Sequence, residues 1–318
     1  MDAIVLAGGY ATRMWPITKH QPKMLLPVGE TTVIDGTLAE LEADERVDTV
    51  YLSTNEAFAN VFADHIEKNG YEKAQLSVED TSDEDEKFGV VGALAQLYER
   101  EDLDDDLFVI AGDNLIGFDL SDFLDHFEKK EAPVLAAYDV GSLEKAKSYG
   151  LVELDGDQVV DFQEKPEEPK STLVSIACYA FPADSVRFAE YLQGENNPDE
   201  PGWYIDWLQD QEPTYAYTFD DVWFDIGEAD AYFDTVEWKL DGGSLIHSDA
   251  TVENSEIGNT VHVMEGAEVI DSQLDRTLVF PNATVRNSDL DETILNHNVE
   301  IADKDIADAL ISQISPEQ

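Results

Sequence analysis

The first half of the chain alternates short apolar runs with longer amphipathic stretches. Short apolar runs that end near glycine or polar residues predict buried strands, and longer stretches with apolar residues three and four apart predict helices. The predicted strands are Ala3–Ala7, Thr49–Ser53, Leu107–Ala111 and Pro133–Tyr138, and the predicted helices are Phe58–Lys68, Val91–Arg100 and Leu120–Lys129. Strands that alternate with helices are typical of βαβ units, so we expect an α/β domain with a mostly parallel sheet. Ligands of such sheets bind beyond the carboxyl ends of the strands.

After residue 150 the pattern changes. Asp155-Gly156 separates two apolar runs and predicts a hairpin. The further predicted elements are strands at Leu151–Leu154, Gln158–Phe162, Leu173–Phe181 and Tyr215–Phe219 and a helix near Ala229–Leu240. Gly242-Gly243 then marks a boundary between domains.

Beyond this boundary the sequence repeats itself. Ala250–Ile257 is echoed by Ala267–Leu274 and again by Ala283–Leu290, at offsets of 17 and 16 residues. Aliphatic residues recurring in this way predict a β-helix of three or four coils that bury one narrow core. We therefore expect a first domain at 1–241, a β-helix at 244–303 and a tail at 304–318. The exposed end of a β-helix favours self-association, so a homo-oligomer is expected.

The net charge of the chain indicates the solution conditions and the partners that suit it. It has 70 Asp+Glu against 19 Lys+Arg, a formal net charge of -51, yet 43% of its residues are hydrophobic, which excludes a disordered chain. Such a surface is screened at molar salt, where the Debye length is about 3 Å, so we expect a halophilic source. The charge argues against nucleic acid and anionic membranes as partners. One cysteine, Cys178, excludes an internal disulfide. With no long apolar span and no basic N-terminal flank, a cytoplasmic location is expected.

The segment after the first predicted strand carries the strongest chemical signal. It reads Leu6-Ala7-Gly8-Gly9-Tyr10-Ala11-Thr12-Arg13-Met14-Trp15-Pro16 and continues to Pro22-Lys23-Met24-Leu25-Leu26-Pro27-Val28. Glycines directly after a strand let backbone N–H groups approach phosphate oxygens, because no Cβ stands in the way. Arg13 and Lys23 add positive charge that phosphate binds. The segment matches neither the P-loop nor the dinucleotide fingerprint. From the residues alone, a phosphate-binding loop and a tight turn between strand and helix both stay open.

This segment closely resembles the signature loop of the sugar nucleotidylyltransferases, or nucleotide-sugar pyrophosphorylases. That pattern is Gly-Gly-x-x-Thr-Arg-Leu-x-Pro-x-Thr followed by Pro-Lys-x-Leu-Leu-Pro-Val, and here Met14 replaces the Leu. Further segments resemble the family's other motifs in the same order: Gly89-Val90-Val91-Gly92-Ala93-Leu94, Ala111-Gly112-Asp113-Asn114, Tyr149-Gly150-Leu151-Val152, Glu164-Lys165-Pro166 and Trp223-Phe224-Asp225-Ile226-Gly227. The resemblance extends to about Leu240, and the repeats resemble the left-handed β-helix tails that some members carry. It implies a Rossmann-like α/β fold with a mostly parallel mixed sheet, plus a short C-terminal left-handed parallel β-helix.

The resemblance also implies a reaction and roles for single residues. An oxygen of a sugar 1-phosphate attacks the α-phosphorus of a nucleoside triphosphate in line, and pyrophosphate leaves. Arg13 and Lys23 would neutralise the triphosphate, Lys165 would contact the sugar phosphate, and Asp113 and Asp225 would hold Mg²⁺. The nucleotide is expected to contact Leu6, Ala7, Gly8, Gly9, Gly89 and Asp113, and the sugar phosphate is expected to contact Gly150, Glu164, Lys165 and Ser175.

Several positions depart from the family pattern. Ser175 stands where members usually have an Asn that touches the sugar, Ala177 adds a methyl group, and Val90-Val91 replaces Thr-Ala. These changes leave the sugar open. The loop looks closest to the glucose-1-phosphate thymidylyltransferases, which favours glucose 1-phosphate with dTTP or UTP. The alternatives are a mannose-1-phosphate guanylyltransferase and a non-catalytic sugar-nucleotide-binding regulator. A β-helix acyltransferase is disfavoured, because the repeat region is short.

Overall fold

The computed structural model describes residues 1–79 and 89–312. The chain divides into two compact units, and it passes between them three times. Met1–Gly9 and Ile34–Trp223 form the first unit, whereas Tyr10–Val33 and the chain from Phe224 onward form the second. The signature loop from Tyr10 onward thus belongs to the same unit as the C-terminal repeats, whereas its Leu6–Gly9 segment belongs to the first unit.

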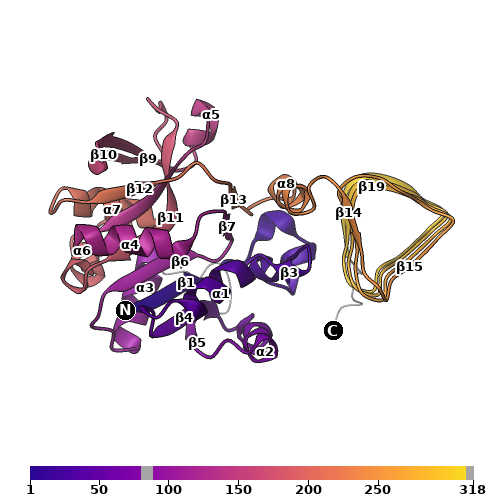
Figure 1. The fold of residues 1–318 in the computed structure, drawn as a ribbon, viewed down its shortest axis with the longest axis horizontal. Coiled ribbons are helices and arrows are strands. Elements are labelled where there is room, and N and C mark those ends of the chain that lie inside the picture. The colour runs from indigo at the N-terminus through magenta and orange to yellow at the C-terminus, as the bar shows by residue number, and fades with distance from the viewer. Residues whose placement is uncertain (80–88, 313–318) are drawn as a thin grey trace. The chain divides into compact units, whose positions relative to one another are not determined.

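Among the described residues, the first unit is built on a nine-stranded mixed sheet with the order β5-β4-β1-β6-β11-β8-β12-β10-β9 (Figure 1). The strands in this order are β5 (Ala74–Glu79), β4 (Thr49–Asn55), β1 (Asp2–Leu6), β6 (Leu107–Ala111), β11 (Leu173–Phe181), β8 (Val134–Asp139), β12 (Tyr215–Thr218), β10 (Gln158–Glu164) and β9 (Gly150–Asp155). The strands from β5 to β6 are all parallel. Beyond β6 the pairings are antiparallel, except for the parallel pair β12 and β8.

Helices cover both faces of this sheet. They are α1 (Asp35–Ala43), α2 (Ala59–Asn69), α3 (Val90–Arg100), α4 (Leu120–Lys130), α5 (Leu143–Ala146), α6 (Phe188–Gln193) and α7 (Pro201–Gln209), with the short strand β7 (Asn114–Ile116) and a 3-10 turn at Ala183–Ser185. Residues of α3, α6 and α7 share one core with Ile4 and Val109. Phe108 points to the opposite face, because strand residues alternate, and it contacts Phe123 of α4. The sheet is therefore buried on both sides.

Most predicted elements of the first unit are confirmed. Leu107–Ala111 and Leu173–Phe181 are strands with the predicted bounds, and Gly156, in the predicted hairpin, has a φ of +67°. The helices and strands of the first unit that were not predicted are α1, β5, β7, α5, α6 and α7. The strand β5 was missed because it lies at the edge of the sheet, where alternate polar residues replace a continuous apolar run.

No helix among the described residues is long and apolar enough to cross a bilayer.

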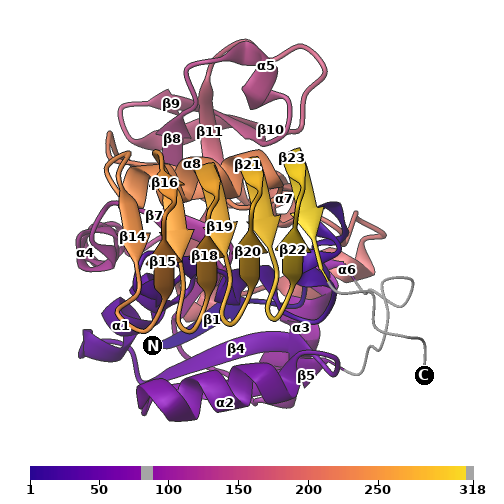
Figure 2. The ribbon, with the colours of Figure 1, turned by 90° about the vertical axis from the view of Figure 1, so that its right-hand side faces the viewer.

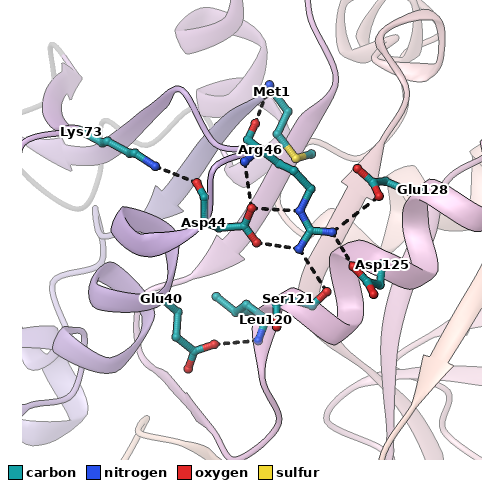
Figure 3. A network of polar contacts seen from close by, with 9 residues as sticks. All are labelled: Met1, Glu40, Asp44, Arg46, Lys73, Leu120, Ser121, Asp125 and Glu128. Carbon is teal, nitrogen blue, oxygen red and sulfur yellow. Dashed lines mark hydrogen bonds and ion pairs between the residues drawn. The ribbon is translucent and has the colours of Figure 1, made fainter.

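A polar network around Arg46 joins distant segments of the first unit (Figure 3). The guanidinium of Arg46 donates to both carboxylate oxygens of Asp44, at 2.9 and 2.6 Å, and to Asp125 of α4 at 2.7 Å. It also donates to the carbonyl of Ser121, and its own carbonyl accepts from the Met1 ammonium at 2.9 Å. The ion pair holds the pKa of Asp44 below its ordinary value, through the hydrogen bonds from Arg46. The network fixes the turn after α1 against α4 and the start of β1.

Arg46→Met is expected to lower the free energy of unfolding by about 2–4 kcal/mol, because it leaves the nearly buried Asp44 carboxylate without its main partner. Equilibrium denaturation at fixed high salt measures the change. Lys147→Met is the control, since the pair of Lys147 with Glu144 is exposed and worth under about 1 kcal/mol. Equal losses in the two variants would contradict a special role for the Arg46 network.

The second unit begins at Tyr10 of the signature loop. This loop holds three 3-10 turns, η1 (Thr12–Met14), η2 (Ile17–Lys19) and η3 (Lys23–Leu25), and the hairpin of β2 (Pro27–Val28) with β3 (Thr31–Thr32). The strand β13 (Trp223–Asp225) leads into the unit, and α8 (Ala229–Lys239) follows it. Tyr232 of α8 is fully buried and donates its hydroxyl to the carbonyl of Pro27 at 2.6 Å. The loop and α8 therefore pack as one body.

The repeats form a parallel β-helix, whose coils lie side by side in Figure 2. Its strands are β14 (Ser244–Ile246), β15 (Thr251–Glu253), β16 (Glu256–Ile257), β17 (Val261–Val263), β18 (Glu268–Ile270), β19 (Gln273–Val279), β20 (Thr284–Arg286), β21 (Asp289–Leu295), β22 (Glu300–Ala302) and β23 (Asp305–Ile311). Thr277 pairs with Thr293 and Thr293 with Ala309, so each coil takes 16 residues here. The ladder continues past residue 303, where the repeats are expected to end, because β23 pairs with β21. Residues 313–318 of the expected tail lie outside the described part of the chain.

The corners of the β-helix repeat as strictly as its strands. Asn254, Asp271, Asn287 and Asp303 occupy one corner, and all four have φ between 45° and 56°. Asn and Asp tolerate this left-handed conformation better than other residues with a Cβ. The second corner carries Thr260, Arg276, Glu292 and Asp308, also at positive φ. The residue types at the first corner therefore suit a positive φ. At the second corner Thr, Arg and Glu do not favour a positive φ, so contacts must stabilise the backbone there.

The outer face of one side of the β-helix is buried. Leu278 and Ile294 alternate with Val279 and Leu295 of the inner core, so they point outward, yet both are 0% exposed. The same side of the β-helix carries contacts with the rest of the second unit.

Several of these contacts are hydrogen bonds. Arg276 donates to Asp234 and Glu237 of α8, at 2.7 and 2.5 Å. Asn296 donates to the carbonyl of Ile17 at 3.4 Å, and Nε2 of His297 lies 3.2 Å from Oε1 of Gln21. The β-helix is thus attached to α8 and to the signature loop through two different coils.

Candidate functional site

The carboxyl end of β1 lies at the point where the strand order reverses. The chain leaves β1 and returns to β4 on one side, and it later enters β6 on the other side. Ligands of open α/β sheets bind at such a switch point. Leu6, Ala7 and Gly8 occupy it, as the sequence predicts for a nucleotide site.

The backbone at this end is held from both neighbouring strands. The side-chain amide of Asn55 donates to the carbonyl of Gly8 at 2.9 Å, and the Thr54 hydroxyl lies 3.4 Å from the carbonyl of Ala7. The Gly112 N–H donates to the carbonyl of Leu6 at 2.9 Å, and a Cβ on Gly112 would lie 3.1 Å from that oxygen. The backbone of the switch point is therefore held by both neighbouring strands, and a side chain at Gly112 would crowd the Leu6 carbonyl.

Asp113 follows Gly112 in the turn between β6 and β7. Its neighbour Asn114 is buried and accepts a hydrogen bond from the indole of Trp223 at 2.7 Å. Asp113 thus comes from the carboxyl end of β6, directly beside the carboxyl end of β1. This is the position that the sequence predicts for a metal-binding carboxylate.

Gly89 opens α3 with a φ of +75°. A Cβ at this position would lie 2.4 Å from the carbonyl oxygen of Pro198, so only glycine fits. The N–H groups of Val90 and Val91 donate to the carbonyls of Asp199 and Pro198, at 3.2 and 2.9 Å. These first N–H groups of α3 are therefore already paired with backbone.

The predicted sugar-phosphate residues come together through the strand register. Ser175 of β11 pairs with Gly150 of β9, and Gly150 pairs with Glu164 of β10. Cys178 pairs with Ile110, so Ser175 lies past the end of β6, on the edge that carries Asp113. Ser175, Gly150 and Glu164 thus extend the row of site residues along one edge of the sheet.

Glu164 lies between two glycines. A Cβ on Gly150 would lie 2.9 Å from Oε2 of Glu164, and a Cβ on Gly202 would lie 1.7 Å from the same oxygen. Gly202 belongs to α7, far from Glu164 in the sequence, and no sequence pattern pointed to it. The only feature of the sequence that could have pointed to Gly202 is the Pro201-Gly202 pair at the start of an apolar helix.

Lys165 has a conformation that is rare for a residue with a Cβ. Its φ is +45°, and Pro166 follows it. Such a backbone costs roughly 1–3 kcal/mol and occurs at functional sites as well as at structural turns. The ammonium of Lys165 pairs with the carboxylate of Glu200, a second residue that the sequence analysis missed. A sugar phosphate that binds Lys165 would replace this carboxylate.

The pKa of Glu164 is raised to about 7, chiefly by burial and then by the negative charge of Glu200; Lys165 opposes this rise. A carboxyl group with a raised pKa stabilises the fold below its unfolded value of 4.5, and this stabilisation is lost as the pH rises through about 7. The Glu164 carboxyl is therefore a proton acceptor that titrates close to neutrality.

Glu164→Gln is expected to be more stable than the wild type at pH 8 and no more stable at pH 4. Between these values the difference should grow by about 1–2 kcal/mol, a figure reduced for the partial exposure of the carboxyl. Chemical denaturation at fixed salt over this pH range measures it. Glu168→Gln is the control, because Glu168 is exposed. A parallel pH dependence in both variants would contradict the assignment to Glu164.

Ser175 and Ala177, where the chain departs from the family pattern, lie at an irregularity in β11. The register of β11 against β8 shifts between Ser175 and Tyr179. Ser175 is buried, and its hydroxyl donates to the carbonyl of Ile176 at 3.2 Å. Bulges of this kind re-aim side chains next to active sites. The departures therefore fall where the strand is already deformed.

The second unit carries the remaining predicted residues. Arg13 lies in η1, after Ala11 at a φ of +47°, and it donates to Glu228 at 2.8 Å. Nη2 of Arg13 and Oδ1 of Asp225 both lie within 4 Å of the position that a Cβ on Gly227 would occupy. Gly227 thus keeps the space between a predicted phosphate cation and a predicted metal carboxylate free. Lys23 lies in η3, whose turn is held by the Gln21 amide through the carbonyl of Leu25 at 2.8 Å.

The donor set fits a magnesium ion that substrate helps to bind. Within residues 1–79 and 89–312 no group of three or more His, Cys, Asp or Glu side chains is arranged for a metal. Mg²⁺ is usually held by one or two carboxylates, with phosphate oxygens and water completing its shell. Asp113 of the first unit and Asp225 of the second are each a carboxylate of this kind.

Comparison with known proteins decides the family. The model of the nucleotidyl transferase family matches residues 2–242. The chain belongs to this family. Within the family it is a sugar-1-phosphate nucleotidylyltransferase.

Relatives of this nucleotidyl transferase carry different specificities. A protein of Sulfolobus acidocaldarius assigned as a mannose-1-phosphate guanyltransferase is 29% identical, over 86% of this chain and 75% of its own length. The glucose-1-phosphate adenylyltransferase of Mycoplasma mobile is 26% identical, over 89% of this chain and 82% of its own. The bifunctional protein GlmU of Methanocaldococcus jannaschii is 25% identical over 84% of this chain, which spans 61% of that protein.

Solved structures confirm the fold of this nucleotidyl transferase. A protein of Bacillus anthracis assigned as a glucose-1-phosphate thymidylyltransferase superposes with a TM-score of 0.65 at 21% identity, over 76% of this chain and 96% of that one. A UDP-glucose pyrophosphorylase bound to UDP-glucose superposes with a TM-score of 0.63 at 21% identity, over 76% of this chain and 98% of that one. The expected α/β nucleotidyltransferase fold is confirmed.

Proposed function

We propose that this nucleotidyl transferase joins a nucleoside triphosphate to a hexose 1-phosphate and releases pyrophosphate. The observation that carries the proposal is the row of residues along one edge of the sheet. Gly8 and Asp113 lie at the switch point, and the paired strands extend this edge to Ser175, Gly150 and Glu164. A site for a nucleotide and a site for a sugar phosphate thus share one edge of one unit.

The residues of the chain contribute by position and charge. Lys165 holds the sugar phosphate once Glu200 is displaced, and Glu164 accepts hydrogen bonds from sugar hydroxyls. Arg13 and Lys23 neutralise the triphosphate and the leaving pyrophosphate. Mg²⁺, held by Asp113 and Asp225, would supply further charge neutralisation at the phosphates. No protein nucleophile is required, because the sugar phosphate oxygen attacks directly.

Two pairs of substrates remain to be separated. The signature loop favours glucose 1-phosphate with dTTP or UTP, whereas the Sulfolobus relative supports mannose 1-phosphate with GTP. The test is pyrophosphate release at molar salt with Mg²⁺, crossing four nucleotides against glucose, mannose and N-acetylglucosamine 1-phosphates. Release that requires both substrates establishes the transferase and names its product. If folded protein that still binds nucleotide releases no pyrophosphate with any combination, the result would support a non-catalytic, sugar-nucleotide-binding regulator.

A further inference from the structure

The signature loop has little regular structure to hold it in one conformation. From Thr12 to Leu25 its regular elements are the three 3-10 turns η1, η2 and η3. Such turns have poorer hydrogen-bond geometry than an α-helix, so a run of them needs support from its surroundings. Arg13 in η1 and Lys23 in η3, the two cations proposed to neutralise the triphosphate, require a fixed backbone to meet the phosphates in one geometry. The contacts that hold these turns therefore bear on the reaction.

The two residues that follow β21, Asn296 and His297, contact this loop from the β-helix. Nε2 of His297 lies 3.2 Å from Oε1 of Gln21. The amide nitrogen of Gln21 already donates to the carbonyl of Leu25 at 2.8 Å, so Oε1 is the acceptor and Nε2 of His297 donates to it. Leu25 ends the turn η3, which begins at Lys23. A hydrogen bond from the β-helix thus orients the side chain that holds the turn of one cation.

A second contact leads from the same place to Arg13. The side-chain amide of Asn296 donates to the carbonyl of Ile17 in η2 at 3.4 Å. The next residue, Thr18, is fully buried, and its hydroxyl donates to the carbonyl of Ala11 at 2.8 Å. Ala11 has a φ of +47° and directly precedes η1, the turn that carries Arg13. The two neighbouring residues of the β-helix therefore support the turns of both cations.

The β-helix holds this pair of residues in place. The backbone N–H of Asn296 donates to the carbonyl of Ile311 in the next coil at 2.8 Å, and its side-chain oxygen accepts from the N–H of His297 at 2.8 Å. The ring of His297 meets the buried ring of Phe280 edge to face, with the ring centroids 5.4 Å apart. The coils on both sides are joined by continuous backbone ladders. The two side chains thus project from a fixed support.

We propose that Asn296 and His297 are positioning residues for the triphosphate, so that the β-helix takes part in nucleotidyl transfer. They act through the signature loop on the turns that carry Arg13 and Lys23. The inference rests on the proposed function, from which it takes the roles of these two cations. The rival is a contact that only stabilises the fold. Such a contact would lower the fraction of folded enzyme, and with it kcat, and would leave the KM for the nucleotide unchanged.

His297→Ala tests the proposal. It should raise the KM for the nucleoside triphosphate by about 3–10-fold, the effect of one hydrogen bond between neutral groups, while kcat and the KM for the sugar 1-phosphate change by less than about twofold. The rise should be equal for dTTP and GTP, because the two cations contact phosphates and not the base. His297→Gln keeps an N–H donor at a comparable reach, so it should restore most of the affinity. Steady-state kinetics at molar salt with Mg²⁺, with each substrate varied in turn, measure these values.

Two further variants make the test specific. His247→Ala is the matched control, because it removes another histidine of the β-helix, whose Nδ1 accepts from the backbone N–H of Asp249 at 3.1 Å. Its KM values should equal those of the wild type. Gln21→Ala shows whether His297 acts through Gln21: adding His297→Ala to it should raise the KM for the nucleotide no further, since the shared hydrogen bond is already lost.

Four results would overturn the inference. They are an unchanged KM for the nucleotide in His297→Ala, an equal rise in His247→Ala, no recovery in His297→Gln, and effects of His297→Ala and Gln21→Ala that multiply.

Failure of the proposed function gives a different result. If the wild type releases no pyrophosphate with any pair of substrates, the transferase fails, and calorimetric titration with dTTP and with GTP in the presence of Mg²⁺ tests the positioning role. A Kd for both nucleotides that rises by about 3–10-fold in His297→Ala, and not in His247→Ala, supports this role. Equal Kd values in the wild type and His297→Ala overturn it, as does a wild type that binds neither nucleotide.

Discussion

Asp113→Asn should lower kcat for pyrophosphate release by roughly 10²–10³-fold, because it removes charge that stabilises the metal and the triphosphate in the transition state. Asp113 follows β6 at the switch point, directly beside the end of β1. Its amide replacement keeps the shape of the side chain, so the fold should not change. Initial rates at saturating substrates, measured over a range of Mg²⁺ concentrations, give the loss. The Mg²⁺ concentration for half-maximal rate should rise with it.

Asp104→Asn provides the control for this prediction. Asp104 is exposed and lies before the amino end of β6, so the two substitutions remove the same charge from opposite ends of one strand. Its activity should stay within about twofold of the wild type, as for surface changes in general. Equal losses would show that net charge, and not a metal ligand at the switch point, governs the rate.

Gly202→Ala should raise the KM for the sugar 1-phosphate by about 10–100-fold, as expected for a lost hydrogen bond to a charged group. The new Cβ would lie 1.7 Å from Oε2 of Glu164, so the carboxylate must move. The displaced atom is the end of a flexible side chain, so stability should fall little. The KM for the nucleotide should stay within about twofold, because Glu164 belongs to the sugar-phosphate residues. Steady-state kinetics with each substrate varied in turn separate the two effects.

Two other glycines make this prediction specific. Gly36 lies in α1, and nothing lies within 4 Å of the position that a Cβ there would occupy, so Gly36→Ala should leave both KM values unchanged. Gly150→Ala would place a Cβ 2.3 Å from the ring of Phe162, which is buried in the core. It should therefore destabilise the fold as well as the site. An unchanged KM for sugar phosphate in Gly202→Ala would remove Glu164 from that site.

The sequence predicts those parts of the site that lie in local motifs. Gly8, Asp113 and Lys165 follow strands in recognisable segments, and β6 and β11 have the predicted bounds. Glu200, Gly202 and His297 escaped prediction, because each reaches its partner only through tertiary packing. Gly202 is opposed to Glu164 by the packing of α7 on β10, and His297 reaches Gln21 from the β-helix. Such neighbours leave no periodic signal in the sequence.

The prediction for the repeats was accurate within a coil and incomplete at their end. The octads that begin at Ala250, Ala267 and Ala283 show the repeat, because its small and aliphatic positions recur at the same spacing. In the last coil, which carries β23, Val299 replaces the octad's first Ala and Asp303-Lys304 stands in place of its Asn-Ser pair. This coil is recognised by the parallel backbone pairing of β23 with β21, because its sequence does not show the repeat.

The attachment of the β-helix determines where its length can change. Arg276 meets α8 from one coil, and Asn296 and His297 meet the signature loop from the next. A coil inserted before Arg276 would move all three side chains by one strand spacing, about 4.8 Å, and separate them from their partners. A coil added after Ile311 would move none of them. Longer and shorter forms of this enzyme should therefore differ by whole multiples of about 16 residues at the C-terminal end, while the distance in sequence from Gly243 to Arg276 stays constant.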